Sequence, residues 1–228
     1  MVSRAVRGFT VNLLGRYYTQ RLIDENRAGE EDAVPIFLRI EQIAAYARYV
    51  GRPDSERGRI LGVTRVARFL EEHRGKVPIK NSSSGFILSD QKTYGLWGLY
   101  SVSARVSGLL ADGPVGLTDW ANDFVEQQYV PRLRSHESKL IKLIRDGGTL
   151  DALTDKLQRI LRIEALLAPA EALFELILAR NGQVPAILAS HVADHWGSRV
   201  PNLRDPLAPL MKDICDAVGD DQASTLQQ

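Results

Sequence analysis

The chain has 228 residues, of which 44% are hydrophobic and 25% are charged, and its formal net charge is +1 at pH 7. These values are typical of a folded globular protein, and they exclude a disordered chain or one that binds nucleic acid through a strongly basic overall charge. The single cysteine, Cys215, excludes an internal disulfide and a cysteine-rich zinc site, which predicts a cytoplasmic protein.

The charge is distributed unevenly along the chain. Residues 1–80 hold 15 Lys and Arg against 10 Asp and Glu, whereas residues 147–228 hold 7 against 11. Any contact with phosphate groups is therefore expected near the N-terminus. The sequence contains no run of about 18 apolar residues, so no segment is predicted to span a membrane.

The N-terminal part predicts two helices, over residues 9–25 and 35–50, because apolar residues recur there at helical spacing. Gly51 is expected to end the second helix. The apolar stripe of that helix contains Ile36, Ile40, Ile43, Ala47 and Val50. Its opposite side is expected to face solvent and carries Arg39, Glu41, Gln42 and Arg48.

A third helix is predicted from Arg59 to about residue 73, where the chain meets Pro78 and the segment Asn81–Gly85. Between these, Val77 and Ile79 predict one short strand. Ser89 or Asp90 is then expected to cap the next helix, because its side-chain oxygen can accept a hydrogen bond from a first-turn amide.

Residues 95–120 contain five glycines and Pro114. The pattern predicts a helix in which Val102, Val106, Leu109 and Leu110 point toward the core. Its exposed side would then carry Ser101, Ser103, Arg105 and Ser107. The next residues predict a tight hairpin around Asp112, Gly113 and Pro114, with Thr118 capping the helix that follows.

The order of these elements from Arg59 to about Val130 resembles the winged helix-turn-helix superfamily. The resemblance implies four consecutive parts: a second helix at Ser89–Tyr100, a recognition helix at Val102–Leu110, a wing at Ala111–Leu117 and a further helix at Thr118–Tyr129. It also implies that the recognition helix enters the major groove of DNA. The residues implied in nucleic-acid contact are Ser103, Arg105 and Ser107, with Lys92 on the preceding helix.

Two features of this segment differ from a typical DNA-binding surface. Its exposed side has a single arginine, Arg105, and the hairpin carries Asp112, which would repel phosphate. The same shape could therefore serve a contact with another protein. Gly95 and Gly98 fall inside a predicted helix, where they are expected to permit close packing or a break.

After Trp120 the sequence predicts helices almost to its end, including one over residues 149–167, and then a disordered tail. The predicted fold is mainly α, with a winged-helix-like centre and one small β-hairpin between helical flanks. The expected regions are an N-terminal helical pair (1–58), the winged-helix-like module (59–134), a C-terminal helical domain (135–218) and the tail (219–228).

Three further groups of residues are candidate sites. A basic patch that could contact phosphate consists of Arg48, Arg52, Arg57 and Arg59. His191 and His195 lie one helical turn apart, a spacing that can hold a metal ion, although a surface helix with two histidines is the plainer interpretation. Glu137 and Lys139 match half of a nuclease motif, but their segment predicts an amphipathic helix instead of a strand.

These observations predict a non-catalytic, DNA-associated subunit of a complex that acts on nucleic acid, in regulation or in antiviral defence. Double-stranded DNA is the expected nucleic-acid partner, together with a protein partner or a second copy of the chain. The alternative is a protein–protein adaptor that uses the winged-helix-like module and the C-terminal helices for assembly without DNA. No cofactor and no metal ion is predicted.

Overall fold

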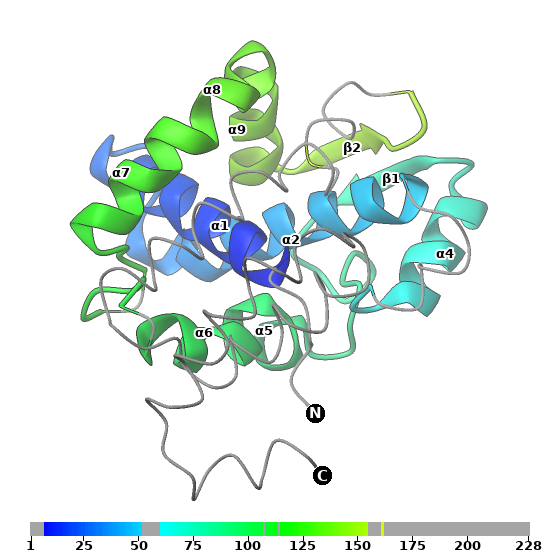
Figure 1. Ribbon diagram of the computed structural model, residues 1–228. Helices are drawn as coiled ribbons and strands as arrows, with labels where there is room; N and C mark the ends of the chain where they lie inside the picture. The colour runs from blue at the N-terminus through cyan, green and yellow to red at the C-terminus, as the bar shows by residue number, and fades with distance from the viewer. Residues whose placement is uncertain (1–6, 52–59, 107, 114, 155–160, 162–228) are drawn as a thin grey trace, which may run out of the picture.

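The computed structural model describes residues 7–51, 60–106, 108–113, 115–154 and 161 (Figure 1). These residues are mainly helical, as the sequence predicts. The helices are α1 (Arg7–Asp24), α2 (Ala33–Val50), α4 (Val63–Glu72), α5 (Gln91–Tyr94), α6 (Leu96–Val106), α7 (Asp119–Gln128), α8 (Val130–Leu133) and α9 (Glu137–Asp146). Short 3₁₀ turns are η1 (Glu30–Asp32) and η2 (Arg134–His136), and the strands are β1 (Lys76–Ile79) and β2 (Gly148–Asp151). Within these residues no helix has both the length and the apolar character needed to cross a bilayer.

Helices α1 and α2 pack against each other at the centre of the fold, and the other elements surround them (Figure 1). Helices α6 and α7 contact α1, whereas α4 and α9 contact α2. Residues from Phe9 to Thr19 are all buried, and so are those from Ile40 to Arg48. A helix that is buried all round needs neighbours on every side, which explains why these two helices are central.

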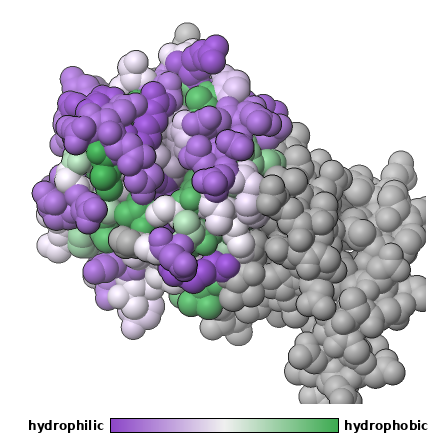
Figure 2. Space-filling model, turned by 90° about the vertical axis from the view of Figure 1, so that its left-hand side faces the viewer, coloured by the Kyte–Doolittle hydropathy of each residue, from purple (hydrophilic) through white to green (hydrophobic). Residues whose placement is uncertain are grey.

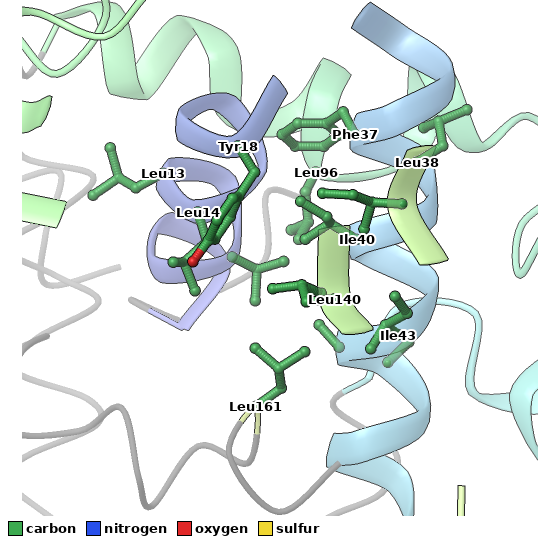
Figure 3. Close-up of a cluster of buried hydrophobic side chains, with 14 of the residues drawn as sticks. Leu13, Leu14, Tyr18, Phe37, Leu38, Ile40, Ile43, Leu96, Leu140 and Leu161 are labelled. Atoms are coloured by element: carbon green, nitrogen blue, oxygen red, sulfur yellow. The ribbon is translucent and has the colours of Figure 1, made fainter. Parts of the chain in front are cut away.

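One hydrophobic cluster contains residues from the described parts of all three predicted regions, 1–58, 59–134 and 135–218. Figure 3 shows Leu96 of α6 and Leu140 of α9 beside Ile40 of α2 in this cluster. The described parts of the three regions therefore share a core. Most of the predicted C-terminal region, and the whole tail at 219–228, lie outside the described residues.

The two strands form an antiparallel sheet in which Val77 pairs with Leu150. The strand expected at Val77 and Ile79 is confirmed as β1. The helix expected from residue 149 is wrong at its start, because Leu150 belongs to β2. The chain leaves α9 through Gly147 and Gly148, whose positive φ angles of 76° and 137° turn it into the strand.

The helix break that the winged-helix resemblance implies near Ser101 is wrong; the break lies at Gly95, where the glycines also allow one. Helix α6 begins at Leu96, continues through Ser101 and ends at Val106. The boundaries expected at Ser89–Tyr100 and Val102–Leu110 are therefore wrong. Gly95 has an extended backbone between α5 and α6, and the first amide of α6 finds its partner on another helix, as described below.

The hairpin expected between Ala111 and Leu117 is present as an isolated antiparallel bridge between Leu110 and Leu117. The amide of Ala111 donates to the carbonyl oxygen of Gly116 at 3.0 Å. Thr118 precedes α7 as expected, but its hydroxyl donates to the carbonyl oxygen of Gly108 at 2.8 Å and does not cap the helix. Strand β1 pairs with β2, so the hairpin stands apart from the sheet.

Arg39 of α2 holds the C-terminal end of α9. Its guanidinium Nη1 donates to the carbonyl oxygen of Ile144 at 2.7 Å and also to that of Arg145. Carbonyls in the last turn of a helix have no partners within the helix, and a cation beside them also interacts favourably with the helix dipole. Arg39 therefore links the central helix to α9.

We expect Arg39→Met to lower the free energy of unfolding by about 1–2 kcal/mol, because it removes these hydrogen bonds and leaves the carbonyls without their cation. Arg68→Met is the matched control. Arg68 lies exposed on α4 with Glu72 at 3.6 Å, and such a surface pair contributes less than about 1 kcal/mol. Urea denaturation measures both variants; equal effects would contradict the role of Arg39.

Candidate functional site

The candidate site is the helix pair α5–α6 and the polar groups that hold it against α1 and α2. Asp90 begins the pair: its Oδ1 accepts a hydrogen bond from the amide of Thr93 at 3.0 Å. This confirms the expected cap at the start of the helix and fixes the first turn of α5.

Glu41 of α2 holds the start of α6. Its side chain is only 2% exposed, and its Oε1 accepts a hydrogen bond from the amide of Leu96 at 2.7 Å. Amides in the first turn of a helix have no partner within the helix, and a carboxylate suits them electrostatically. Glu41 thus supplies from α2 the acceptor that a capping residue supplies locally in other helices.

Gln91 of α5 is the second partner of this carboxylate. Its Nε2 donates to Glu41 Oε2 at 2.9 Å and to the carbonyl oxygen of Leu38 at 3.0 Å. Its Oε1 accepts from the amide of Ile87 at 3.1 Å, and the side chain is 1% exposed. One amide side chain therefore ties α5 to α2 and to the loop that precedes it.

Burial raises the pKa of Glu41 to about 7, against an ordinary value of 4.5. The two hydrogen bonds from Leu96 and Gln91 lower the pKa, but burial has the larger effect. A small cavity of about 10 Å³, at the lower limit for one water molecule, lies beside Glu41 and is lined also by Arg48 and Ile60.

The expectation that this side of α2 faces solvent is wrong. Glu41, Gln42 and Arg48 are all buried, and Arg48 is 8% exposed. Gln42 pairs with the backbone of Lys80, accepting from its amide at 3.1 Å and donating to its carbonyl at 3.0 Å. Since neighbouring elements cover this side of α2, Arg48 is not part of an exposed basic patch.

Arg16 of α1 contacts the middle of α6. It is 1% exposed, its Nε donates to Asn12 Oδ1 at 3.1 Å, and its Nη2 donates to Ser101 Oγ at 2.7 Å. The guanidinium carbon lies 4.4 Å from the centre of the Trp97 ring. Burial, and then the charge of Arg105, lower the pKa of Arg16 to about 10.

Gly98 brings α5 and α6 into close contact. A Cβ at this position would overlap the carbonyl oxygen of Thr93 and lie 2.9 Å from that of Lys92. At Gly95 a Cβ would lie 2.6 Å from Glu41 Oε2. Both glycines therefore permit close packing, as the sequence suggests. The end of α5 lies against the side of α6 that carries Gly98.

The outer side of this helix pair carries exposed apolar groups. Val102 is 71% exposed and Tyr94 is 59% exposed, and Arg105 is exposed one turn beyond Val102. The expectation that Val102 points into the core is therefore wrong: Leu96, Tyr100 and Ala104 form the buried side. We call the outer surface, formed by Lys92, Tyr94, Gly98, Val102 and Arg105, the α5–α6 face.

Of the predicted contact residues, Arg105 and Lys92 lie exposed on this face. Ser103 belongs to α6, but the structure does not describe its side chain. The other predicted residues fall outside the described ranges: Ser107, Arg52, Arg57, Arg59, His191 and His195. The sequence does not indicate the structural roles of Glu41 and Arg16, because the groups that they contact lie 55 and 85 residues away along the chain.

Glu137 has a structural position. It begins α9, as the amphipathic pattern predicts, and its Oε1 accepts hydrogen bonds from Arg21 at 2.7 Å and from Tyr18 at 3.2 Å. Both partners lie on α1, so Glu137 joins α9 to α1. Among the residues that the structure describes, no group of three or more His, Cys, Asp or Glu side chains could hold a metal ion.

Comparison with protein-family models, with curated proteins and with solved structures found no significant match to this chain. The assignment of a function therefore depends on the geometry of its own residues.

Glu41 predicts a specific dependence of stability on pH. Because its pKa is about 7 in the folded protein, the folded state holds this proton more firmly than the unfolded chain does. The resulting stability is complete below about pH 4.5 and is lost as the pH rises through about 7. Relative to Glu41→Gln, we expect the free energy of unfolding of the wild type to fall by about 3 kcal/mol between about pH 4 and pH 8.

Urea denaturation at several pH values measures this difference, and subtracting the variant removes the contribution of other titrating groups. A gap between the two proteins that stays constant over this range would contradict a buried Glu41 with a raised pKa.

Proposed function

We propose that the protein is a non-catalytic assembly subunit that binds another protein through the α5–α6 face. The observation that carries this proposal is the exposure of Val102 and Tyr94, at 71% and 59%, on a helix pair held firmly from behind. Exposed apolar side chains close together are characteristic of protein contact surfaces, because a partner removes them from water.

The rigidity of the face supports this proposal. Glu41 and Gln91 fix the junction of α5 and α6, and Arg16 fixes the middle of α6. A surface whose backbone is already positioned loses less conformational freedom when a partner binds. These buried contacts therefore support a docking function for the exposed side.

The charges around the face favour a protein partner over nucleic acid. The exposed cations are Lys92 and Arg105, while Asp90, Asp112 and Asp119 are exposed nearby in the sequence. DNA-binding surfaces combine several cations with few acids, since each phosphate contact draws on a positive or neutral donor. The mixture found here suits a contact with a protein.

Association with double-stranded DNA is the second candidate. The order of α6 followed by the hairpin at Leu110–Leu117 is the feature that supports the resemblance to winged-helix proteins. Arg105 lies exposed in the last turn of α6, directly before that hairpin. In this second proposal Arg105 contacts DNA, and the complex acts in regulation or in defence against foreign DNA.

Two substitutions distinguish these candidates. Val102→Asn removes an apolar contact without adding charge, so it should weaken a protein complex at least about tenfold but leave DNA binding unchanged. Arg105→Ala should reduce DNA binding, and that binding should fall steeply with added salt. Thr64→Asn, at an exposed position on α4, is the control for a polar substitution elsewhere.

The measurement is co-expression with the proteins encoded beside this one, followed by affinity determination on any stoichiometric complex, and anisotropy with a labelled DNA duplex. A complex that Val102→Asn leaves unchanged would overturn the proposed contact. Duplex binding that depends on Arg105 and salt, together with no protein complex, would favour the second candidate.

A further inference from the structure

We propose that the α5–α6 face recognises a partner segment whose apolar side chains are flanked by Asp or Glu. This inference rests on the proposed protein-binding function and specifies the chemistry of the partner. It depends on three observations: the exposed apolar side chains of both helices, the charge of Arg105, which forms no ion pair with any described residue, and the buried charge of Arg16 behind it.

Each of the two helices exposes an apolar side chain on the face, Tyr94 on α5 and Val102 on α6. The carbonyls of Thr93 and Lys92 lie against Gly98, so the end of α5 rests on the outer side of α6. Val102 follows Gly98 by about one helical turn and Arg105 by about two, which places both on that same side. Tyr94 and Val102 can therefore bury apolar atoms of a single segment.

The positive charge at one end of the face has no acidic partner among the described residues. Arg105 is exposed and, in the part of the chain that the structure describes, forms no ion pair. Asp90, which precedes α5, accepts the amide of Thr93, and neither Asp112 nor Asp119, exposed after α6, pairs with Arg105. A partner carboxylate beside Arg105 would thus gain an interaction that no described residue supplies.

Arg16 increases the positive potential at this end. Its buried guanidinium donates to Ser101, which lies one turn before Arg105 on α6, and the charge of Arg105 lowers the pKa of Arg16. Two like charges close to each other are repelled, and a partner anion would reduce that repulsion. Lys92 supplies a second exposed cation at the α5 end of the face.

The combination of charge and exposed apolar area favours an acidic protein segment over a phosphate backbone. A phosphate backbone satisfies the cations but leaves Tyr94 and Val102 facing a charged, hydrated surface. A segment with apolar residues between carboxylates buries the first group and pairs the second. Figure 2 shows the side of the molecule at the left of Figure 1, where hydrophobic groups are interspersed among hydrophilic ones.

A random peptide library displayed on phage, selected against the full chain, tests this inference. We expect the enriched peptides to share apolar residues flanked by two or more Asp or Glu. A synthetic peptide of the enriched sequence should then bind at least about tenfold more weakly to Val102→Asn and to Arg105→Glu. Its affinity should also fall with added salt, because ion pairs contribute to it.

Lys142→Glu is the matched control for charge reversal, since Lys142 is exposed on α9, away from the face. It should leave peptide binding unchanged. The inference would be overturned by a selection that enriches no peptide, by enriched peptides that are basic or uncharged, or by binding that neither substitution on the face weakens.

Two further measurements distinguish an acidic protein segment from DNA and from a second copy of the chain as the occupant of the face. A DNA duplex that competes with the peptide and binds more tightly, or a dimer in sedimentation equilibrium that Val102→Asn dissociates, would each overturn it in favour of that other occupant. A protein complex that needs Val102 while the selected peptides lack acids would overturn this inference alone and leave the proposed function standing.

Discussion

The buried carboxylate of Glu41 is the interaction on which the arrangement of the exposed helices depends. It stands on a central helix, is almost entirely removed from water, and accepts the amide that begins α6. Removing a carboxylate from water is unfavourable unless its oxygens are hydrogen-bonded, and both oxygens of Glu41 have N–H donors. The position of α6 is therefore coupled to the burial of this side chain, although burial still disfavours its charged form and raises its pKa.

A second polar anchor acts from the other central helix. Arg16 of α1 reaches Ser101, so α6 is attached to α2 at its first residue and to α1 near its middle. Leu96, Tyr100 and Ala104 fill the space between these anchors with apolar contacts. With one side of α6 held in this way, the side that carries Val102 and Arg105 is left for contact with another molecule.

Local features of the fold could be predicted from the sequence. Helical spacing predicts α1, α2 and α9, and the sequence limits the cap of α5 to Ser89 or Asp90, of which the structure shows Asp90, whose partner lies three residues away. The buried position of Glu41 could not be predicted from the sequence. Periodicity along α2 assigns its polar residues to solvent, whereas α6, whose first residue lies 55 residues further along the chain, covers that side. The prediction for Val102 is wrong because it assigned the wrong side of the helix to the core. The buried side of α6, which begins at Leu96, contains Tyr100 and Ala104.

The most direct test of this account is hydrogen exchange at the amide of Leu96. This amide has no acceptor within α6, so its protection depends on Glu41. The account predicts slow exchange in the wild type and a loss of at least about tenfold in Glu41→Ala, measured relative to amides in the middle of α1. Fast exchange in the wild type, or unchanged relative protection in the variant, would contradict the claim that Glu41 holds the exposed helix pair in place.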